Sequence, residues 1–403
     1  MAADIELIPN GTVTSAKGYL AGATFAGINR YSRHKLDLGI LFSEVPCSTV
    51  GVFTKNKIKA APVILSKQKL PSSTIKAIVV NSGCANASTG KAGIMDAMAV
   101  IAAVAQKTKV KTQDVLIAST GVIGTRLPLD SINEALRKIE LSKDGGKTLA
   151  KAIMTTDTTT KEVAVTTTSG DFIVGGIAKG SGMIHPQLGT LLCFLTTDVV
   201  TDVDFLAVAL RKAVDISFNM VSIDGDTSPN DTVLLMANGL ASNTVIKHNS
   251  KDADIFQEVL NRACIQLARA IAHDGEGATK LIQVIVKGAA STEDARSAAK
   301  TVVGSQLVKA ALYGNDPNWG RIIAAVGRSG ADLIESKLDM YIGDVQLIKK
   351  GSPLSINTEE VVRSLKTDNI TIVLDINIGK ATATAWGCDL SEEYVIINSQ
   401  YTT

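Results

Sequence analysis

The chain has 403 residues, of which 45% are hydrophobic and 20% charged, and 41 basic residues nearly balance 39 acidic ones. This composition is that of a globular protein of roughly two to three domains. The formal net charge of +2 leaves no basic excess for binding nucleic acid. No apolar run reaches the ~20 residues of a membrane span.

The first residues, MAADIELIPNG, are acidic and lack the basic region of a secretory signal. The five cysteines are scattered and form no C-x-x-C pair. This pattern favours reduced, buried thiols in a cytoplasmic protein over a disulfide framework or a zinc site.

Two charged segments have alternative interpretations. Lys55, Lys57 and Lys59 follow a strand predicted at 49–54 and form either a small anion site or, as we favour, a solvated strand edge. Residues 224–231 resemble a calcium loop, but Pro229 replaces the required glycine and no glutamate closes the loop. We interpret that segment as an acidic turn.

Two predicted strands in the first half, at 75–80 and 115–118, each end in small polar residues and glycine. Such strand ends in α/β proteins leave backbone N–H groups free to face a ligand. Thr120 and Gly121 are therefore candidate oxyanion-hole donors, through a hydroxyl and an N–H. The alternative is an ordinary turn after a strand.

A predicted hairpin, 163–167 with 172–178, leads into the stretch KGSGMIHPQLGTLLCFLTTD at 179–198. Small residues come first, then the Gly189-Thr190 bond, and then an apolar run. The pattern delivers one threonine to the head of a buried strand, as a nucleophile at a strand's N-terminus requires. A glycine-rich loop entering a core strand is the alternative.

In the second half, apolar residues recur at i, i+4 over 252–272 and predict a helix. Glu276 follows it, between two glycines, as a carboxylate suited to a substrate ammonium. The alternative is a helix C-terminal turn in which Gly275 takes the left-handed conformation. Ser291 and Asp294 predict the start of another helix. Strands are predicted at 232–237, 281–286, 370–378, 381–386 and 394–403.

Several common sites are absent from the sequence pattern. No dinucleotide-binding or P-loop motif, Ser-His-Asp set or histidine spacing for a metal is present. Eight segments, however, occur in the order in which one family has them: NSGCANASTG, IASTGVIG, IMTTDT, KGSGMI-P-LGTLL-F-TTD, FNMVSIDGDTSPND, HDGEGATK, NDPNWGRI and INSQYTT. Nearly end to end, the chain resembles the ornithine acetyltransferases, the glutamate N-acetyltransferases of arginine biosynthesis.

The resemblance implies an α/β fold, a four-layer α/β/β/α sandwich related to self-processing aminopeptidases. It implies self-cleavage at Gly189-Thr190 into an α chain, 1–189, and a β chain, 190–403, assembled as two of each. It implies no metal and no bound cofactor. Thr190 would be the nucleophile, with Thr120 and Gly121 as oxyanion donors. The implied substrate-binding residues are Thr156, Lys179, Thr190, Glu276, Asn398 and Thr403.

The implied chemistry is a ping-pong acetyl transfer from N2-acetylornithine to glutamate, giving ornithine and N-acetylglutamate. Cleavage would give Thr190 a free α-amine, whose pKa near ~7.7–8.0 suits a general base. Gly189 stands where the family usually has alanine, and changes nearby leave acceptor choice and the use of acetyl-CoA open. The rival hypotheses are a self-processed aminopeptidase or amidohydrolase of this fold, and a metabolite-binding protein that never cleaves.

Overall fold

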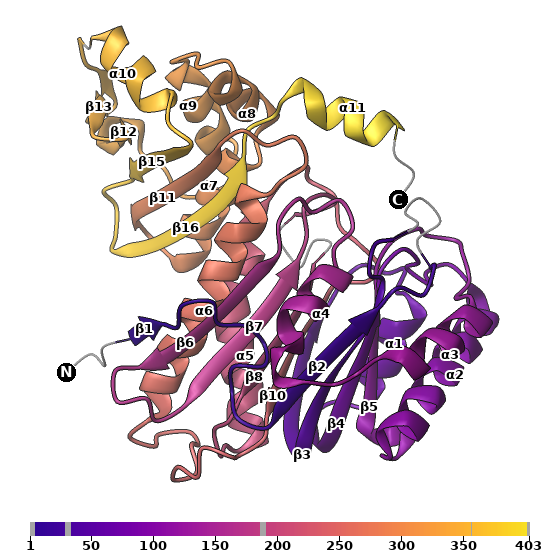
Figure 1. Ribbon diagram of the computed structural model, residues 1–403. Helices are drawn as coiled ribbons and strands as arrows, with labels where there is room; N and C mark the ends of the chain where they lie inside the picture. The colour runs from indigo at the N-terminus through magenta and orange to yellow at the C-terminus, as the bar shows by residue number, and fades with distance from the viewer. Residues whose placement is uncertain (1–4, 29–33, 186–190, 356, 401–403) are drawn as a thin grey trace.

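The computed structural model of the protein describes residues 5–28, 34–185, 191–355 and 357–400 (Figure 1). Over these residues the strands form a nine-stranded and a seven-stranded sheet. The nine-stranded sheet has the order β1-β6-β7-β8-β10-β3-β4-β5, with β2 paired to β3. Its strands are β1 (Ile5–Leu7), β2 (Tyr19–Thr24), β3 (Leu38–Phe53), β4 (Ser72–Asn81), β5 (Val115–Ser119), β6 (Lys161–Thr167), β7 (Ile173–Lys179), β8 (Leu192–Thr197) and β10 (Thr232–Ala237).

The long strand β3 divides the nine-stranded sheet into two layers. Its first residues, 38–43, pair with β2 and β4, whereas 48–53 pair with β10. The β3–β4 register shifts twice between Phe42 and Thr49, and such irregularities bend a strand. The apolar face between the two layers holds Tyr19, Leu41, Ile78, Phe194 and Leu234, all buried.

Helices cover the two outer faces. Successive residues of β4 point to opposite sides, so Ile78 faces the core between the layers while Val79 faces the helices α1 (Ala61–Gln68), α2 (Gly90–Thr108) and α3 (Leu129–Lys138). On the other side, α5 (Val203–Asp215) and α6 (Ala253–His273) cover β6, β7, β8 and β10. The predicted four-layer α/β/β/α sandwich is therefore confirmed, and its layers run from α6 on the left to α2 on the right of Figure 1.

The seven-stranded sheet, of order β14-β13-β12-β15-β11-β16-β9, lies in the upper lobe of Figure 1. Helix α6 contacts strands of both sheets, and one continuous core joins the lobe to the sandwich. The strands are β9 (Val221–Ser222), β11 (Leu281–Ala289), β12 (Asp339–Ile342), β13 (Val345–Lys349), β14 (Ser352–Pro353), β15 (Asn369–Asp375) and β16 (Ala381–Cys388). The remaining helices are α4 (Gly146–Ala152), α7 (Thr292–Val303), α8 (Gln306–Tyr313), α9 (Trp319–Gly327), α10 (Thr358–Leu365) and α11 (Glu392–Gln400).

Strands from both predicted chains share the nine-stranded sheet. β8 and β10 follow residue 190, yet they lie between β7 and β3, which precede it. A break at 189–190 would therefore leave two chains joined through strand pairing on both flanks. The division into 1–189 and 190–403 remains a prediction.

The strand predicted at 394–403 is wrong over its described part, which forms helix α11. Short apolar runs fit either structure, and neighbouring strands offer 394–400 no partner, so local helical bonds prevail. Two glutamates in the first turn suit the helix N-terminus. Val395 is 64% exposed, so this segment is not packed down as the sequence suggests.

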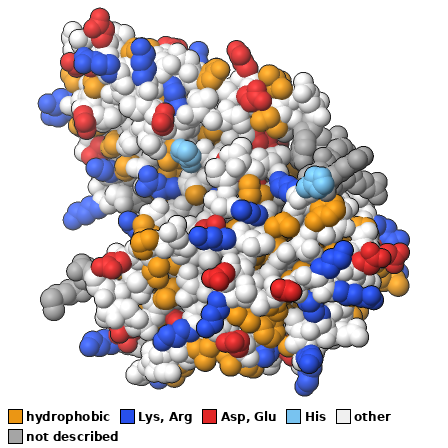
Figure 2. All heavy atoms as spheres, viewed as in Figure 1, with side chains coloured by type: hydrophobic (Ala, Val, Ile, Leu, Met, Phe, Trp, Pro, Cys, Tyr) orange, Lys and Arg blue, Asp and Glu red, His pale blue; other side chains and the backbone are white. Residues whose placement is uncertain are grey.

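The cysteine environments and the distribution of surface charge agree with what the composition predicts. The five cysteines are all buried, as predicted, and none of them is in a disulfide. Acidic and basic side chains are interspersed on the face shown in Figure 2, in keeping with a near-zero net charge. Among the helices described, none has both the length and the apolar character to cross a bilayer.

Candidate active site

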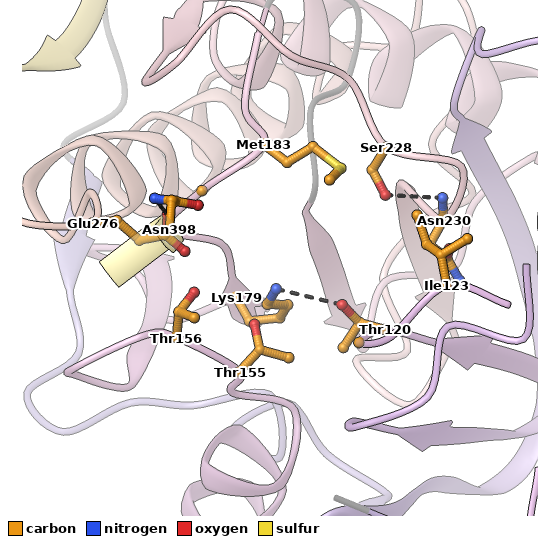
Figure 3. A pocket seen from close by; sticks show the side chains of 12 residues that line it. Thr120, Ile123, Thr155, Thr156, Lys179, Met183, Ser228, Asn230, Glu276 and Asn398 are labelled. Atoms are coloured by element: carbon orange, nitrogen blue, oxygen red, sulfur yellow. Dashed lines mark hydrogen bonds between the residues drawn. The ribbon is translucent and has the colours of Figure 1, made fainter. Parts of the chain in front are cut away.

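A polar cavity of about 90 Å³ lies where β7 ends and the chain approaches β8. Lys179, the last residue of β7, pairs with Leu192, the first residue of β8, so residues 180–191 connect two neighbouring strands. Gly189, Thr190 and Thr403 lie outside the described residues. The cavity brings together the other residues singled out from the sequence: Thr120, Gly121, Thr156, Lys179, Glu276 and Asn398 (Figure 3).

The turn after β5 contains Thr120 and Gly121, which both line the cavity. Thr120 is buried, and its own N–H donates to Asn81 O at 3.0 Å. Gly121 has φ +126°, and a Cβ there would lie 2.4 Å from the carbonyl carbon of Gly83. Within the described part of the chain, the Gly121 N–H has no hydrogen-bond acceptor. The turn thus requires glycine and leaves one donor free beside the Thr120 hydroxyl.

If the predicted oxyanion role holds, replacing Gly121 by alanine is expected to lower kcat for the predicted acetyl transfer about 100-fold, because the added Cβ would displace one donor. The matched control is Gly124→Ala, which also has positive φ but meets nothing within 4 Å of its new Cβ. Steady-state kinetics of both variants check this. A Gly121→Ala enzyme with kcat no lower than that of Gly124→Ala contradicts the role.

Lys179 provides a buried positive charge at the centre of the cavity. Its Nζ lies 3.5 Å from Thr120 Oγ1, the one hydrogen bond that this ammonium makes within the described residues. Burial lowers the pKa of Lys179, the Asp157 carboxylate opposes that shift, and Lys161 adds to it. A buried cation with so few contacts favours an anionic ligand, such as a substrate carboxylate.

A buried ion network holds the loops around Lys179. Lys161 Nζ lies 2.7 Å from Asp157 Oδ1 and 2.5 Å from Asp274 Oδ2, and all three side chains are buried. Asp157 also accepts from the N–H of Gly180 at 2.7 Å. Burial alone would raise the pKa of Asp157, but the Lys179 and Lys161 ammonium groups outweigh it and hold that pKa well below its usual range. The network joins the 154–160 loop, the end of β7 and the end of α6.

Glu276 lies on the opposite side of Lys179 from Thr120 (Figure 3). Its N–H donates to Ser181 O at 2.8 Å, and its Oε2 accepts from Asn398 Nδ2 at 2.8 Å. The alternative that Gly275 takes the left-handed conformation is wrong. Gly277 has φ +68° instead, while a Cβ at Gly275 would lie 2.6 Å from Cys388 Sγ. The cavity therefore has a cation at its centre and a carboxylate on one side.

The acidic turn at 224–231 holds the chain segments around the cavity through hydrogen bonds. The sequence interpretation missed this role. Asp224 accepts from the N–H groups of Met183 and Ile184. Asp231 Oδ1 accepts from the N–H of Leu191 at 3.2 Å, directly after the predicted cleavage bond. Burial raises the pKa of Asp231 well above its usual value, against the opposing effects of the Leu191 N–H and Lys179. The turn thus holds both ends of the β7–β8 connection.

Asn230, in the same segment, fixes the turn after β5 that carries Thr120 and Gly121. Its Nδ2 donates to Ser119 O and Ala85 O, each at 2.7 Å. Ser228 accepts from the Asn230 N–H and, like Asn230, lines the cavity. The sequence did contain a signal for these two residues: the block FNMVSIDGDTSPND, which matches the family, has several polar residues shortly before a strand.

No group of three or more metal-binding side chains occurs among the described residues.

The comparisons with known proteins all point to one family, and the sequence matches cover nearly the whole chain. The profile of the ArgJ family matches residues 20–403. "Arginine biosynthesis bifunctional protein ArgJ" of Dehalococcoides mccartyi is 48% identical over the full length of both chains. The protein of the same name from Oceanobacillus iheyensis is 45% identical over 99% of this chain and 98% of its own. The crystal structure of arginine biosynthesis bifunctional protein argJ from Bacillus halodurans is 45% identical with a TM-score of 0.51, covering 52% of this chain and 98% of that one. This chain belongs to the ArgJ family.

Proposed function

We propose that the protein is an acetyltransferase of arginine biosynthesis that moves the acetyl group of N2-acetylornithine to glutamate. The observation that carries this is one cavity holding an oxyanion donor pair, a buried ammonium and a carboxylate beside the segment that leads to Thr190. The family membership and the names of the full-length relatives support a biosynthetic transferase over a peptidase or amidohydrolase.

The proposed cycle has two steps. The Thr190 hydroxyl attacks the acetyl carbonyl carbon while its own α-amine takes the hydroxyl proton. The Thr120 hydroxyl and the Gly121 N–H stabilise the oxyanion. The amide C–N bond breaks, ornithine leaves with that proton, and an acetyl-threonine ester remains. The glutamate amine then attacks the ester carbonyl carbon, and the bond from that carbon to the Thr190 oxygen breaks. The amine proton returns to the Thr190 oxygen through the α-amine, and N-acetylglutamate leaves.

The charges of the cavity match those of ornithine. The Lys179 ammonium suits an α-carboxylate, and Glu276 suits the side-chain ammonium of ornithine. Asn398 on α11 bonds Glu276 and so closes this end of the cavity. Thr156 bonds Ser181 at 2.7 Å and lines the same wall. Thr403 completes the proposed binding set from the C-terminal end.

Self-cleavage at Gly189-Thr190 is part of the proposal, because the α-amine that activates the nucleophile forms only then. The bond between Asp231 and the Leu191 N–H supports a held geometry on the product side of that bond. The crystallised Bacillus halodurans chain supports it too, since almost all of that chain aligns with only about half of this one. The proposed assembly is two α and two β chains, in the cytoplasm.

The test is N2-acetylornithine labelled in its acetyl group, incubated with enzyme and glutamate. We expect label in N-acetylglutamate. When ornithine with a labelled carbon chain replaces glutamate and the N2-acetylornithine is unlabelled, we expect the label to appear in N2-acetylornithine. N5-acetylornithine serves as the control, because its acetyl group sits on the amine that Glu276 would hold. Label released as acetate at a rate independent of glutamate would instead identify a hydrolase.

Acetyl-CoA is proposed as a second donor, with no cofactor held permanently. The cycle is the same, except that the C–S bond of the thioester breaks in the first step. The relatives' names describe a bifunctional protein, which supports a second activity on the same site.

A further inference from the structure

A second cavity, of about 470 Å³, lies beside the candidate active site. The two cavities share a wall made of two chain segments. On the first segment, Met183 lines the active-site cavity and His185 lines the second cavity. On the other segment, Ser228 lines the active-site cavity and Thr227 lines the second cavity. The two cavities therefore lie on opposite sides of these two segments.

Positive charge dominates this second cavity. Lys300 on α7 and Arg328 after α9 line it together with His185. Burial lowers the pKa of Lys300, and the nearby Arg296 and Lys55 lower it further, with only Asp215 opposing. Burial and Lys300 likewise lower the pKa of His185 against the effect of Asp226.

These cations lack carboxylate partners. Across the described segments, no ion pair joins Lys55, Arg296, Lys300 or Arg328 to an acidic side chain. Gathering like charges without a carboxylate in direct contact costs free energy, which a bound anion would recover. Hydroxyl groups of Thr227 and Thr301 also line this cavity and add neutral donors. Ammonium, guanidinium and hydroxyl donors around one cavity are the chemistry that recognises phosphate oxygens.

We propose that this basic cavity, lined by His185, Thr227, Lys300, Thr301 and Arg328, binds the phosphate groups of an acyl-coenzyme A donor. The inference rests on the proposed acetyl transfer and deepens it. N2-acetylornithine carries no phosphate and does not need the cavity, whereas coenzyme A carries phosphates at the far end from its thioester. Thr190 forms the ester as the C–S bond breaks, and coenzyme A leaves as the thiol with the proton from the Thr190 hydroxyl.

The surroundings of Lys55 are relevant to the two interpretations of the 55–59 segment, an anion site or a solvated strand edge. Lys55 is close enough to Lys300 to shift its pKa, and Asn56 Nδ2 donates to Thr227 O on the cavity wall at 3.4 Å. In this proposal Lys55 adds positive charge near the cavity without lining it.

The test compares coenzyme A with pantetheine, which has the same thiol arm and no phosphates. Calorimetry on the processed enzyme is expected to show coenzyme A binding at least about tenfold more tightly than pantetheine. Lys300→Gln with Arg328→Gln should abolish that difference and raise KM for acetyl-CoA by a similar factor. The control, Arg363→Gln with Lys366→Gln, removes the same charge from exposed positions at the end of α10 and should change neither.

Acetyl transfer from N2-acetylornithine separates this inference from the proposed function. The Lys300/Arg328 variant should keep that activity, since both residues lie outside the active-site cavity. Equal coenzyme A affinity in the wild type and this variant would overturn the phosphate site even with transfer from N2-acetylornithine intact. Inorganic pyrophosphate should compete with coenzyme A. Pyrophosphate binding that depends on Lys300 while coenzyme A fails to bind would also overturn the inference, because the site would then serve a free anion.

Discussion

Replacing Thr190 by alanine is expected to leave a single chain of 42.2 kDa and to lower acetyl transfer by at least about 10⁴-fold. One substitution removes the hydroxyl that attacks its own peptide bond and later the substrate. It also prevents formation of the α-amine that serves as base. Intact-mass measurement and the labelled-acetyl assay check both effects on one preparation.

The matched control is Thr190→Ser, which keeps a hydroxyl at the same position. We expect this variant to split into two fragments and to retain measurable transfer, because only a methyl group is lost. An alanine variant that still splits at 189–190, or that still transfers acetyl at a rate near the wild type, would falsify the proposed mechanism.

Replacing Asp157 by asparagine is expected to lower the free energy of unfolding by about 3 kcal/mol at pH 7. The substitution removes one carboxylate between two buried ammonium groups, leaving Lys161 with Asp274 and Lys179 without its main counter-charge. Asparagine keeps an acceptor for the Gly180 N–H, so the loss reports charge more than hydrogen bonding. Urea unfolding in the uncleaved Thr190→Ala background measures it on a single chain.

The pH dependence follows from the direction of the Asp157 pKa shift. That pKa is depressed in the folded state, so the stabilisation is fully present above the unfolded value near ~3.9 and is lost as pH falls below it. The difference between wild type and Asp157→Asn should therefore shrink on acidification. Asp332→Asn, at an exposed loop position, should change stability by less than about 0.5 kcal/mol at any pH. A difference for Asp157→Asn that stays constant down to pH 3 would contradict the assigned charge network.

Elements with a strong local pattern were predicted well. The i, i+4 stripe over 252–272 corresponds to α6, and the predicted hairpin is β6 with β7. Ser291 caps α7, accepting from the Asp294 N–H and donating to its carboxylate. These features depend on neighbours within one or two turns, which the sequence displays directly.

Local sequence patterns did not predict three features of the structure. These are the bend in β3, the helical conformation of α11 and the contacts of residues 224–231 with the active-site cavity. The bend in β3 shows only in its pairing with β10 and β4, strands far away in the chain. From the sequence, Asp224 and Asp231 are interpreted as solvated turn residues. In the structure their carboxylates accept hydrogen bonds from the connection between β7 and β8.

The amino-acid sequence by itself indicated the family through its ordered motifs, and the resemblance implied the four-layer class and the residues on which acetyl transfer is proposed to depend. Ordered motifs are properties of the linear chain. Tertiary structure alone decided how those residues meet. It placed Lys179 between Thr120 and Glu276, assigned Asp157 to an ion network, and set Lys300 and Arg328 beside His185. Burial and charge compensation depend on contacts between segments far apart in the chain, and no local pattern encodes them.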